Sequence, residues 1–443
     1  DKVIPTITSV SLAANNSTIA VTFSESVYNT NGGSGALEAS DFAFSISSGG
    51  AATLSSTTPT SMISISGNVY TLGISLSGTP NGTETLAVNP VDNGIYDGAG
   101  NEASTSQFNI YNTVTLNDKA GPTISSVSLA SNNSSIAVTF SEAVYNATGG
   151  SGALQASDFS FSIIGGTATL SSATPSSISP NGNVYTLGIS LSGTPNGSEV
   201  LTVNPMDDSI YDSDGNEASM SQSNNTATLN DDIFPIITSV SLAANNSTLA
   251  VTFSEAVYKA TGGSGALEAS DFAFSISGGT ATLSSATPSS ISPNGNVYTL
   301  GINLSGTPNG AEVLTVNPVD DSIYDSAGNE ASTSQSNNTA TLNDQVGPTI
   351  TSASLTSSNN SAVAVTFSES VYNTNGGSGA LQASDFSFSI IGGTATLSSA
   401  TPSSISPNGN VYTLDISLSG TPNGSEVLTV NPMDDSIYDS DGN

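Results

Sequence analysis

The pentapeptide VTFSE occurs four times in the chain, at residues 21–25, 138–142, 251–255 and 365–369. Its valine and phenylalanine flank a threonine, which is the two-residue period of a strand with one buried face. The copies recur at intervals of 113 to 117 residues. A repeat of this length indicates an array of whole domains rather than a solenoid, whose units cannot bury a core alone.

Three further motifs recur in the same order after VTFSE. In the first repeat they are ASDF at residues 39–42, GTPNG at residues 78–82 and IYDGAGN at residues 95–101. The repeat that contains these motifs is as long as a normal independent domain. The predicted domains are residues 1–117, 118–230, 231–343 and 344–443, and the last of them ends before its final strand.

The apolar pattern predicts an all-β fold, because strand periods recur along the chain and the helix period is missing. In the first repeat, the predicted strands are residues 7–12, 18–24, 41–47, 52–56, 69–77, 85–89 and 109–116. Phe23, Phe44, Leu72 and Val88 are the predicted core residues. Seven short strands separated by turn residues fit an immunoglobulin-like Greek-key β-sandwich. Four such domains in tandem would form an elongated rod, at roughly 40 Å per domain.

The composition excludes several classes of function. The chain has 36 acidic residues, three lysines and no arginine, histidine, cysteine or tryptophan. Nucleic-acid binding needs a basic face, which this chain cannot build, and no apolar run is long enough for membrane insertion. Catalytic triads and zinc or copper sites lack their usual ligands. Hard cations with oxygen ligands remain possible. The chain is therefore predicted not to be an enzyme.

These motifs carry a family resemblance. The sequence resembles the bacterial immunoglobulin-like tandem repeats of large secreted surface proteins, best in VTFSE at residues 138–142 and YDSDGN at residues 211–216. It is similar to the repeats of the giant cyanobacterial cell-surface motility protein and to modules of S-layer-associated proteins and adhesins. The resemblance implies an extracellular location at the cell surface and a non-enzymatic role.

The immunoglobulin-type topology predicts that many acidic residues gather at one pole of each repeat. There the loop after the second strand, the loop before the last strand and the linker from the preceding repeat would meet. Calcium binds six to eight oxygen ligands, often mixing carboxylates and carbonyls, and is the predicted cation. The candidate ligands are Glu25, Asp97, Asn101, Asp118, Glu142, Asp212, Asp214, Asn216, Asp231, Glu255, Asp325, Asn329, Asp344, Glu369, Asp439 and Asp441.

A simpler interpretation stands beside the calcium site. Asp-x-x-Gly-Asn is a favourable turn sequence, in which the aspartate binds its own backbone and the glycine adopts a positive φ. The linker aspartate would then cap a turn before Pro122, and Glu142 would bind backbone amides. Both interpretations predict acidic residues at these positions.

Two functions fit the sequence. The first is a structural stalk or filament, because a spacer needs copies and these repeats are nearly identical. The second is an adhesin or lectin-like module that binds surface glycans or other cells through its pole loops. The final repeat stops after IYDSDGN at residues 437–443. Either the sequence is an excerpt of a longer array, or a copy of the chain donates the final strand in a fibre.

Overall fold

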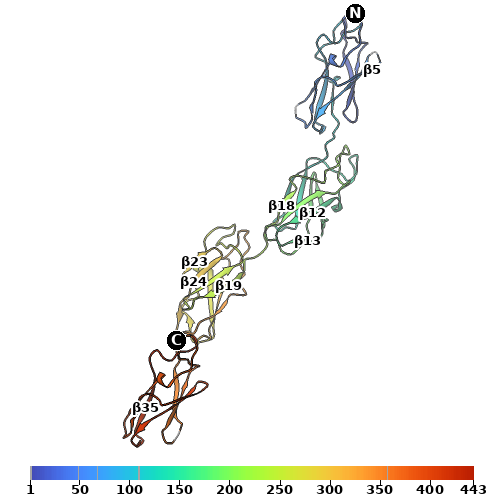
Figure 1. The fold of residues 1–443 in the computed structure, drawn as a ribbon. Helices are drawn as coiled ribbons and strands as arrows, with labels where there is room; N and C mark the ends of the chain where they lie inside the picture. The colour runs from blue at the N-terminus through green and yellow to red at the C-terminus, as the bar shows by residue number, and fades with distance from the viewer. Residues whose placement is uncertain (1, 48, 67, 108–109, 357) are drawn as a thin grey trace. The chain divides into compact units, whose positions relative to one another are not determined.

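The computed structural model describes residues 2–47, 49–66, 68–107, 110–356 and 358–443 (Figure 1). These residues are all-β, with antiparallel strands and four short 3-10 turns as the helical elements. The chain divides into two compact units, Asp1–Asp231 and Asp232–Asn443. Each unit contains two copies of one strand arrangement, while the four predicted domain boundaries stay predictions.

The first copy shows the arrangement. One sheet has the order β1-β2-β6-β5, formed by β1 (Ile7–Leu12), β2 (Thr18–Phe23), β6 (Val69–Gly73) and β5 (Met62–Ser66). The other has the order β3-β8-β9, formed by β3 (Phe42–Ile46), β8 (Thr85–Pro90) and β9 (Thr113–Thr115). Short strands β4 (Thr53–Leu54) and β7 (Leu76–Ser77) pair with each other. This is the ABED and CFG order of constant-type immunoglobulin domains, so the predicted fold class is confirmed.

The later copies repeat this order, apart from the last sheet. The second has β10 (Ile124–Leu129), β11 (Ser135–Phe140), β12 (Phe159–Ile164), β13 (Thr169–Leu170), β14 (Ile178–Asn181), β15 (Val184–Gly188), β16 (Leu191–Ser192), β17 (Val200–Pro205) and β18 (Thr226–Thr228). The third has β19 (Ile237–Leu242), β20 (Thr248–Phe253), β21 (Phe272–Ser277), β22 (Thr282–Leu283), β23 (Ile291–Asn294), β24 (Val297–Gly301), β25 (Leu304–Ser305), β26 (Val313–Pro318) and β27 (Thr339–Thr341). The fourth has β28 (Ile350–Leu355), β29 (Ala362–Phe367), β30 (Phe386–Ile391), β31 (Thr396–Leu397), β32 (Ile405–Asn408), β33 (Val411–Asp415), β34 (Leu418–Ser419) and β35 (Val427–Pro432). The 3-10 turns are η1 (Ala39–Asp41), η2 (Ala156–Asp158), η3 (Ala269–Asp271) and η4 (Ala383–Asp385).

The core of each repeat lies between its two sheets. The four residues predicted to be buried, Phe23, Phe44, Leu72 and Val88, are at most 3% exposed. In the second repeat, the ring of Phe140 lies 6.2 Å from that of Phe159 and 5.9 Å, edge-on, from a tyrosine on β15. Such aromatic contacts hold the two sheets together, because each ring buries a large apolar surface and prefers this edge-to-face geometry.

Three details of the strand prediction differ from the structure. Strand β5 (Met62–Ser66) was not predicted at all, and the strand predicted at residues 69–77 is two strands, β6 and β7. The last strand, β9, is shorter than predicted, and Asn109 within that predicted range lies outside the described residues. Among the described residues, no helix is long and apolar enough to cross a membrane.

Candidate metal centre

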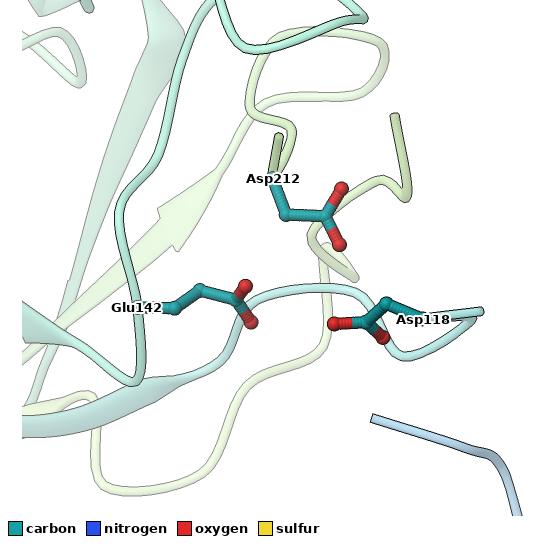
Figure 2. Close-up of side chains that lie close together, drawn as sticks. All are labelled: Asp118, Glu142 and Asp212. Carbon is teal, nitrogen blue, oxygen red and sulfur yellow. The ribbon is translucent and has the colours of Figure 1, made fainter. Parts of the chain in front are cut away.

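Three carboxylates from separate segments converge at one end of the second repeat. Asp118 follows β9 in the linker, Glu142 follows β11, and Asp212 lies in the turn after β17. One carboxylate oxygen from each lies within 4.8 Å of the other two. In Figure 2 the three side chains point toward a common space. We call this set the second-repeat triad.

Backbone contacts fix the linker that carries Asp118. The neighbouring Lys119 N–H donates to the carbonyl of Pro80 in the first repeat, at 2.9 Å. The Asp118 carboxylate accepts the N–H of Ala120, at 2.8 Å. Gly121 then passes so close to the carbonyl of Glu217 that a Cβ there would lie 1.9 Å from its oxygen. The linker is therefore tied to the first repeat and packed against the second.

Asp212 is held by its own turn. It is fully buried, and its Oδ1 accepts the backbone N–H groups of Asp214 and Asn216 at 2.9 and 2.7 Å. Its Oδ2 accepts the side-chain amide of Asn216 at 2.7 Å. This network is what the turn interpretation predicts. A carboxylate oxygen has two lone pairs, so these bonds leave capacity for a cation.

The electrostatics of the triad favour a cation. Burial raises the pKa of Glu142, and the negative charges of Asp118 and Asp212 raise it further. Burial also raises the pKa of Asp118, as do the charges of Asp212 and Asp214. In the third repeat, Lys259 forms ion pairs with Glu268 and Asp271. Three converging carboxylates match the oxygen ligands that calcium uses.

The fourth repeat contains the same arrangement in Asp344, Glu369 and Asp439, whose oxygens also lie within 4.8 Å of one another. We call this set the fourth-repeat triad. Asp439 is fully buried, and its Oδ1 accepts three backbone N–H groups, the longest at 2.9 Å. Burial raises the pKa of Glu369, followed by the charges of Asp439 and Asp344. The linker is again tied to the preceding repeat, because the Gln345 N–H donates to the Pro308 carbonyl at 2.9 Å.

In the first repeat, Asp97 is fully buried and Glu25 is half-buried. The side-chain amide of Asn101 donates to Asp97 at 2.7 Å and is the largest cause of the lowered pKa of Asp97. The residue that corresponds to Asp118 is Asp1, which lies outside the described residues.

The predicted ligands around the third repeat are divided between the two units. Asp231 ends the first unit, whereas Glu255, Asp325 and Asn329 belong to the second. Glu255 is half-buried. Asp325 is fully buried and accepts the Asn329 side-chain amide at 2.8 Å, as in the other repeats.

The remaining predicted ligands lie outside the triads. Asp214 and Asp441 are exposed, two residues beyond the buried aspartate of each turn. Asn216 directs its amide nitrogen at Asp212 and so supports that carboxylate. The aspartate of ASDF has another role: Asp158 accepts the N–H of Gln155 at 2.7 Å and caps η2.

A buried glutamate at the opposite side of the fold was not among the predicted residues. Glu199 is 0% exposed, and its carboxylate accepts the N–H groups of Thr167, Ala168 and Asn196 at 2.6 to 3.1 Å. Gly166 passes over it so closely that a Cβ would lie 2.0 Å from the carboxylate carbon. The available signal was the recurrence of GTPNG-x-Glu in every repeat, with glutamates at Glu84, Glu199, Glu312 and Glu426.

No family model and no curated protein matches this chain. Among solved structures, the chain is similar to domains 1–6 of the surface layer protein SbsC, at 12% identity and a TM-score of 0.20, with 98% of this chain and 67% of that chain covered. It is also similar to invasin, a bacterial integrin-binding protein, at 12% identity and a TM-score of 0.28, with 97% of this chain and 78% of that chain covered.

Proposed function

We propose that this chain is a non-enzymatic extracellular structural protein, a stalk or filament of immunoglobulin-like repeats whose linkers are stiffened by calcium. One observation carries the proposal. A linker carboxylate, Asp118, lies within 4.8 Å of two carboxylates of the following repeat, and Asp344 repeats this in the fourth repeat. A calcium ion at either place would link the linker to the repeat that follows it.

The contacts around the linker explain how an ion would stiffen the chain. Lys119 already holds the start of the linker on Pro80 of the first repeat. An ion bound by Asp118, Glu142 and Asp212 would hold the same linker on the second repeat. Without an ion, the like charges repel one another and favour a more open junction. Calcium would thus act on the hinge and on the repeat that follows it.

The alternative is an adhesin or lectin-like module that binds surface glycans through its pole loops. A surface location fits both functions, as does self-association into a fibre. The adhesin proposal predicts saturable binding on a glycan array, and the stalk proposal needs none.

The stiffening is tested by small-angle X-ray scattering of the full chain with calcium and with excess chelator. We expect chelation to broaden the distribution of interatomic distances, because the linkers gain freedom. The double variant Glu142→Gln, Glu369→Gln should scatter like the chelated chain even when calcium is present. The matched control Asp214→Asn, Asp441→Asn alters exposed acids outside the triads and should respond to calcium like the wild type. Identical scattering of the wild type under both conditions would contradict the stiffening.

A further inference from the structure

The sheet edge formed by β5 in the first repeat differs from the same edge in the other repeats. Strand β5 ends the order β1-β2-β6-β5 and, in the described part of the chain, pairs with β6 alone (Figure 1). Its counterparts β14, β23 and β32 hold the same edge position in their own sheets. Each of these three strands contains the sequence Ser-Pro-Asn, whereas β5 reads Met-Ile-Ser-Ile-Ser.

The prolines occupy a position whose backbone nitrogen faces away from the sheet. Pro180 lies opposite Tyr185, and Pro293 and Pro407 lie opposite the corresponding tyrosines. Proline has no N–H, so a strand accepts it where the nitrogen makes no bond to the neighbouring strand. In these three repeats the outward edge therefore lacks a donor that an added strand would need.

The first repeat has a serine at this position. Ser64 lies opposite Tyr70, which is the equivalent of Tyr185. Ser64 has a backbone N–H, so the outward edge of β5 has the donor that the prolines remove. Because backbone groups alternate in direction along a strand, those of Met62 also face outward. The register shift between β5 and β6 comes after Ser64, so it leaves these two residues in regular pairing.

Two isoleucines flank this serine and face solvent. Ile63 and Ile65 are 60% and 65% exposed. In the second repeat the residues that flank the proline are Ser179 and Asn181, which are both polar. Exposed β-branched side chains beside an edge without proline or lysine favour pairing with another strand. The first repeat therefore combines a free backbone edge with the side chains that stabilise strand pairing.

The charges of the chain indicate which partner fits this edge. The formal net charge is −33, but no charged residue occurs between Asp41 and Glu84, the segment that contains β5. Two copies of so acidic a chain repel one another over most of their surface. At β5 they can approach without bringing like charges together. An uncharged strand with two isoleucines also matches a copy of itself, because β-branched side chains pair well across strands.

We propose that β5 pairs antiparallel with β5 of a second copy of the chain, and so joins two four-stranded sheets across a two-fold axis. Met62 would exchange backbone hydrogen bonds with the partner's Ser64, and Ser64 with the partner's Met62. Ile63 would then lie opposite the partner's Ile63. A pair of five-residue strands buries less than the roughly 1,200 Å² of a stable interface, so the association should be reversible. This contact does not involve the acidic triads.

Sedimentation equilibrium of the full chain in excess chelator tests the pairing separately from calcium. With rising protein concentration, we expect the average mass to increase from that of one chain toward that of two. Ser64→Pro gives β5 the proline of the other three repeats and removes one outward donor from each copy. It should weaken the association at least about tenfold. Its far-ultraviolet circular dichroism should match the wild type, because the same fold accepts proline at this position three times.

Single cysteines locate the contact, since the chain has no cysteine of its own. Opposed residues that are not hydrogen-bonded in an antiparallel pair have Cα atoms about 4.5 Å apart, which a disulfide can span. Ile63→Cys should therefore form a covalent dimer under mild oxidation. Ser179→Cys places a cysteine at the same position beside Pro180 and should cross-link far more slowly. Adding Ser64→Pro to Ile63→Cys should slow its cross-linking to that of Ser179→Cys.

Three results would overturn the proposal. The first is a wild-type chain that stays monomeric at millimolar concentration. The second is association that Ser64→Pro leaves unchanged, because the copies would then meet through another surface. The third is equal rates of cross-linking for Ile63→Cys and Ser179→Cys, which decides the matter even if Ser64→Pro fails to fold.

Discussion

Replacing Glu199 with alanine is expected to lower the free energy of unfolding of the second repeat by about 3 kcal/mol. The carboxylate is fully buried and accepts the N–H groups of Thr167, Ala168 and Asn196. Alanine would leave these donors without their partner in a site that water cannot enter easily. Scanning calorimetry of the full chain should show one transition lowered by about 10 °C or more.

The fourth repeat offers the matched control. Glu426 accepts the equivalent N–H groups of Thr394, Ala395 and Asn423, but it is half-buried rather than fully buried. Water can replace its carboxylate, so Glu426→Ala should cost clearly less than Glu199→Ala. Equal decreases in the free energy of unfolding of the two repeats would contradict the view that the loss of stability comes from buried N–H donors left without an acceptor.

The same glutamate gives stability a defined pH dependence. Burial alone would raise the pKa of Glu199, but the N–H groups of Ala168, Thr167 and Asn196 outweigh it and the pKa is lowered from 4.5. A carboxylate with a lowered pKa stabilises the fold above its unfolded pKa and loses that contribution as the pH falls through the folded value. The contribution of Glu199 should therefore be complete at pH 7 and decline below about pH 4.5.

Calcium is expected to raise the melting temperatures of the second and fourth repeats by about as much as Glu199→Ala lowers that of the second repeat. An ion that binds only the folded state at 100 times its Kd adds about 2.7 kcal/mol, which corresponds to roughly 10 °C or more for a domain of this size. Glu142→Gln should abolish most of that gain in the second repeat, because it removes one charged ligand. Thermal melts with calcium and with chelator measure both effects.

Without metal, Glu142→Gln should raise the melting temperature instead of lowering it. Burial and the charges of Asp118 and Asp212 raise the pKa of Glu142, so its ionised form destabilises the folded state at neutral pH. In chelator, the wild type should therefore gain stability as the pH falls from 7 through the raised pKa. Glu142→Gln should melt higher than the wild type in chelator and lower than it in calcium. A variant that melts lower under both conditions would support the turn interpretation.

The strand positions could be predicted from the sequence because each buried strand alternates apolar and polar residues. Strand β5 was missed because it is an edge strand with little burial, in which Ile63 and Ile65 are 60% and 65% exposed. Its counterparts in later repeats contain a proline, such as Pro180 in β14, which argues against a strand in a sequence pattern. Such a strand forms because it pairs with a neighbouring strand, as β5 does with β6. The local sequence pattern carries no information about that pairing.

The candidate site could be predicted in part because the immunoglobulin-type topology brings the linker and two loops to one pole. Asp118, Glu142 and Asp212 meet there, whereas Asp214 is exposed because it lies two residues further along the turn. Buried Glu199 was missed because a glutamate at the start of a strand is normally exposed. Two of its partners, Thr167 and Ala168, come from a loop about 30 residues earlier, and only the folded chain brings them close to Glu199.

Isothermal titration of calcium into the full chain, previously stripped with chelator, tests the central claim most directly. We expect saturable binding of at least two ions per chain, with one site lost in Glu142→Gln and another in Glu369→Gln. The control Asp214→Asn, Asp441→Asn should keep the wild-type number of sites. Absence of binding at millimolar calcium, or equal binding by Glu142→Gln and the wild type, would contradict a calcium-stiffened stalk.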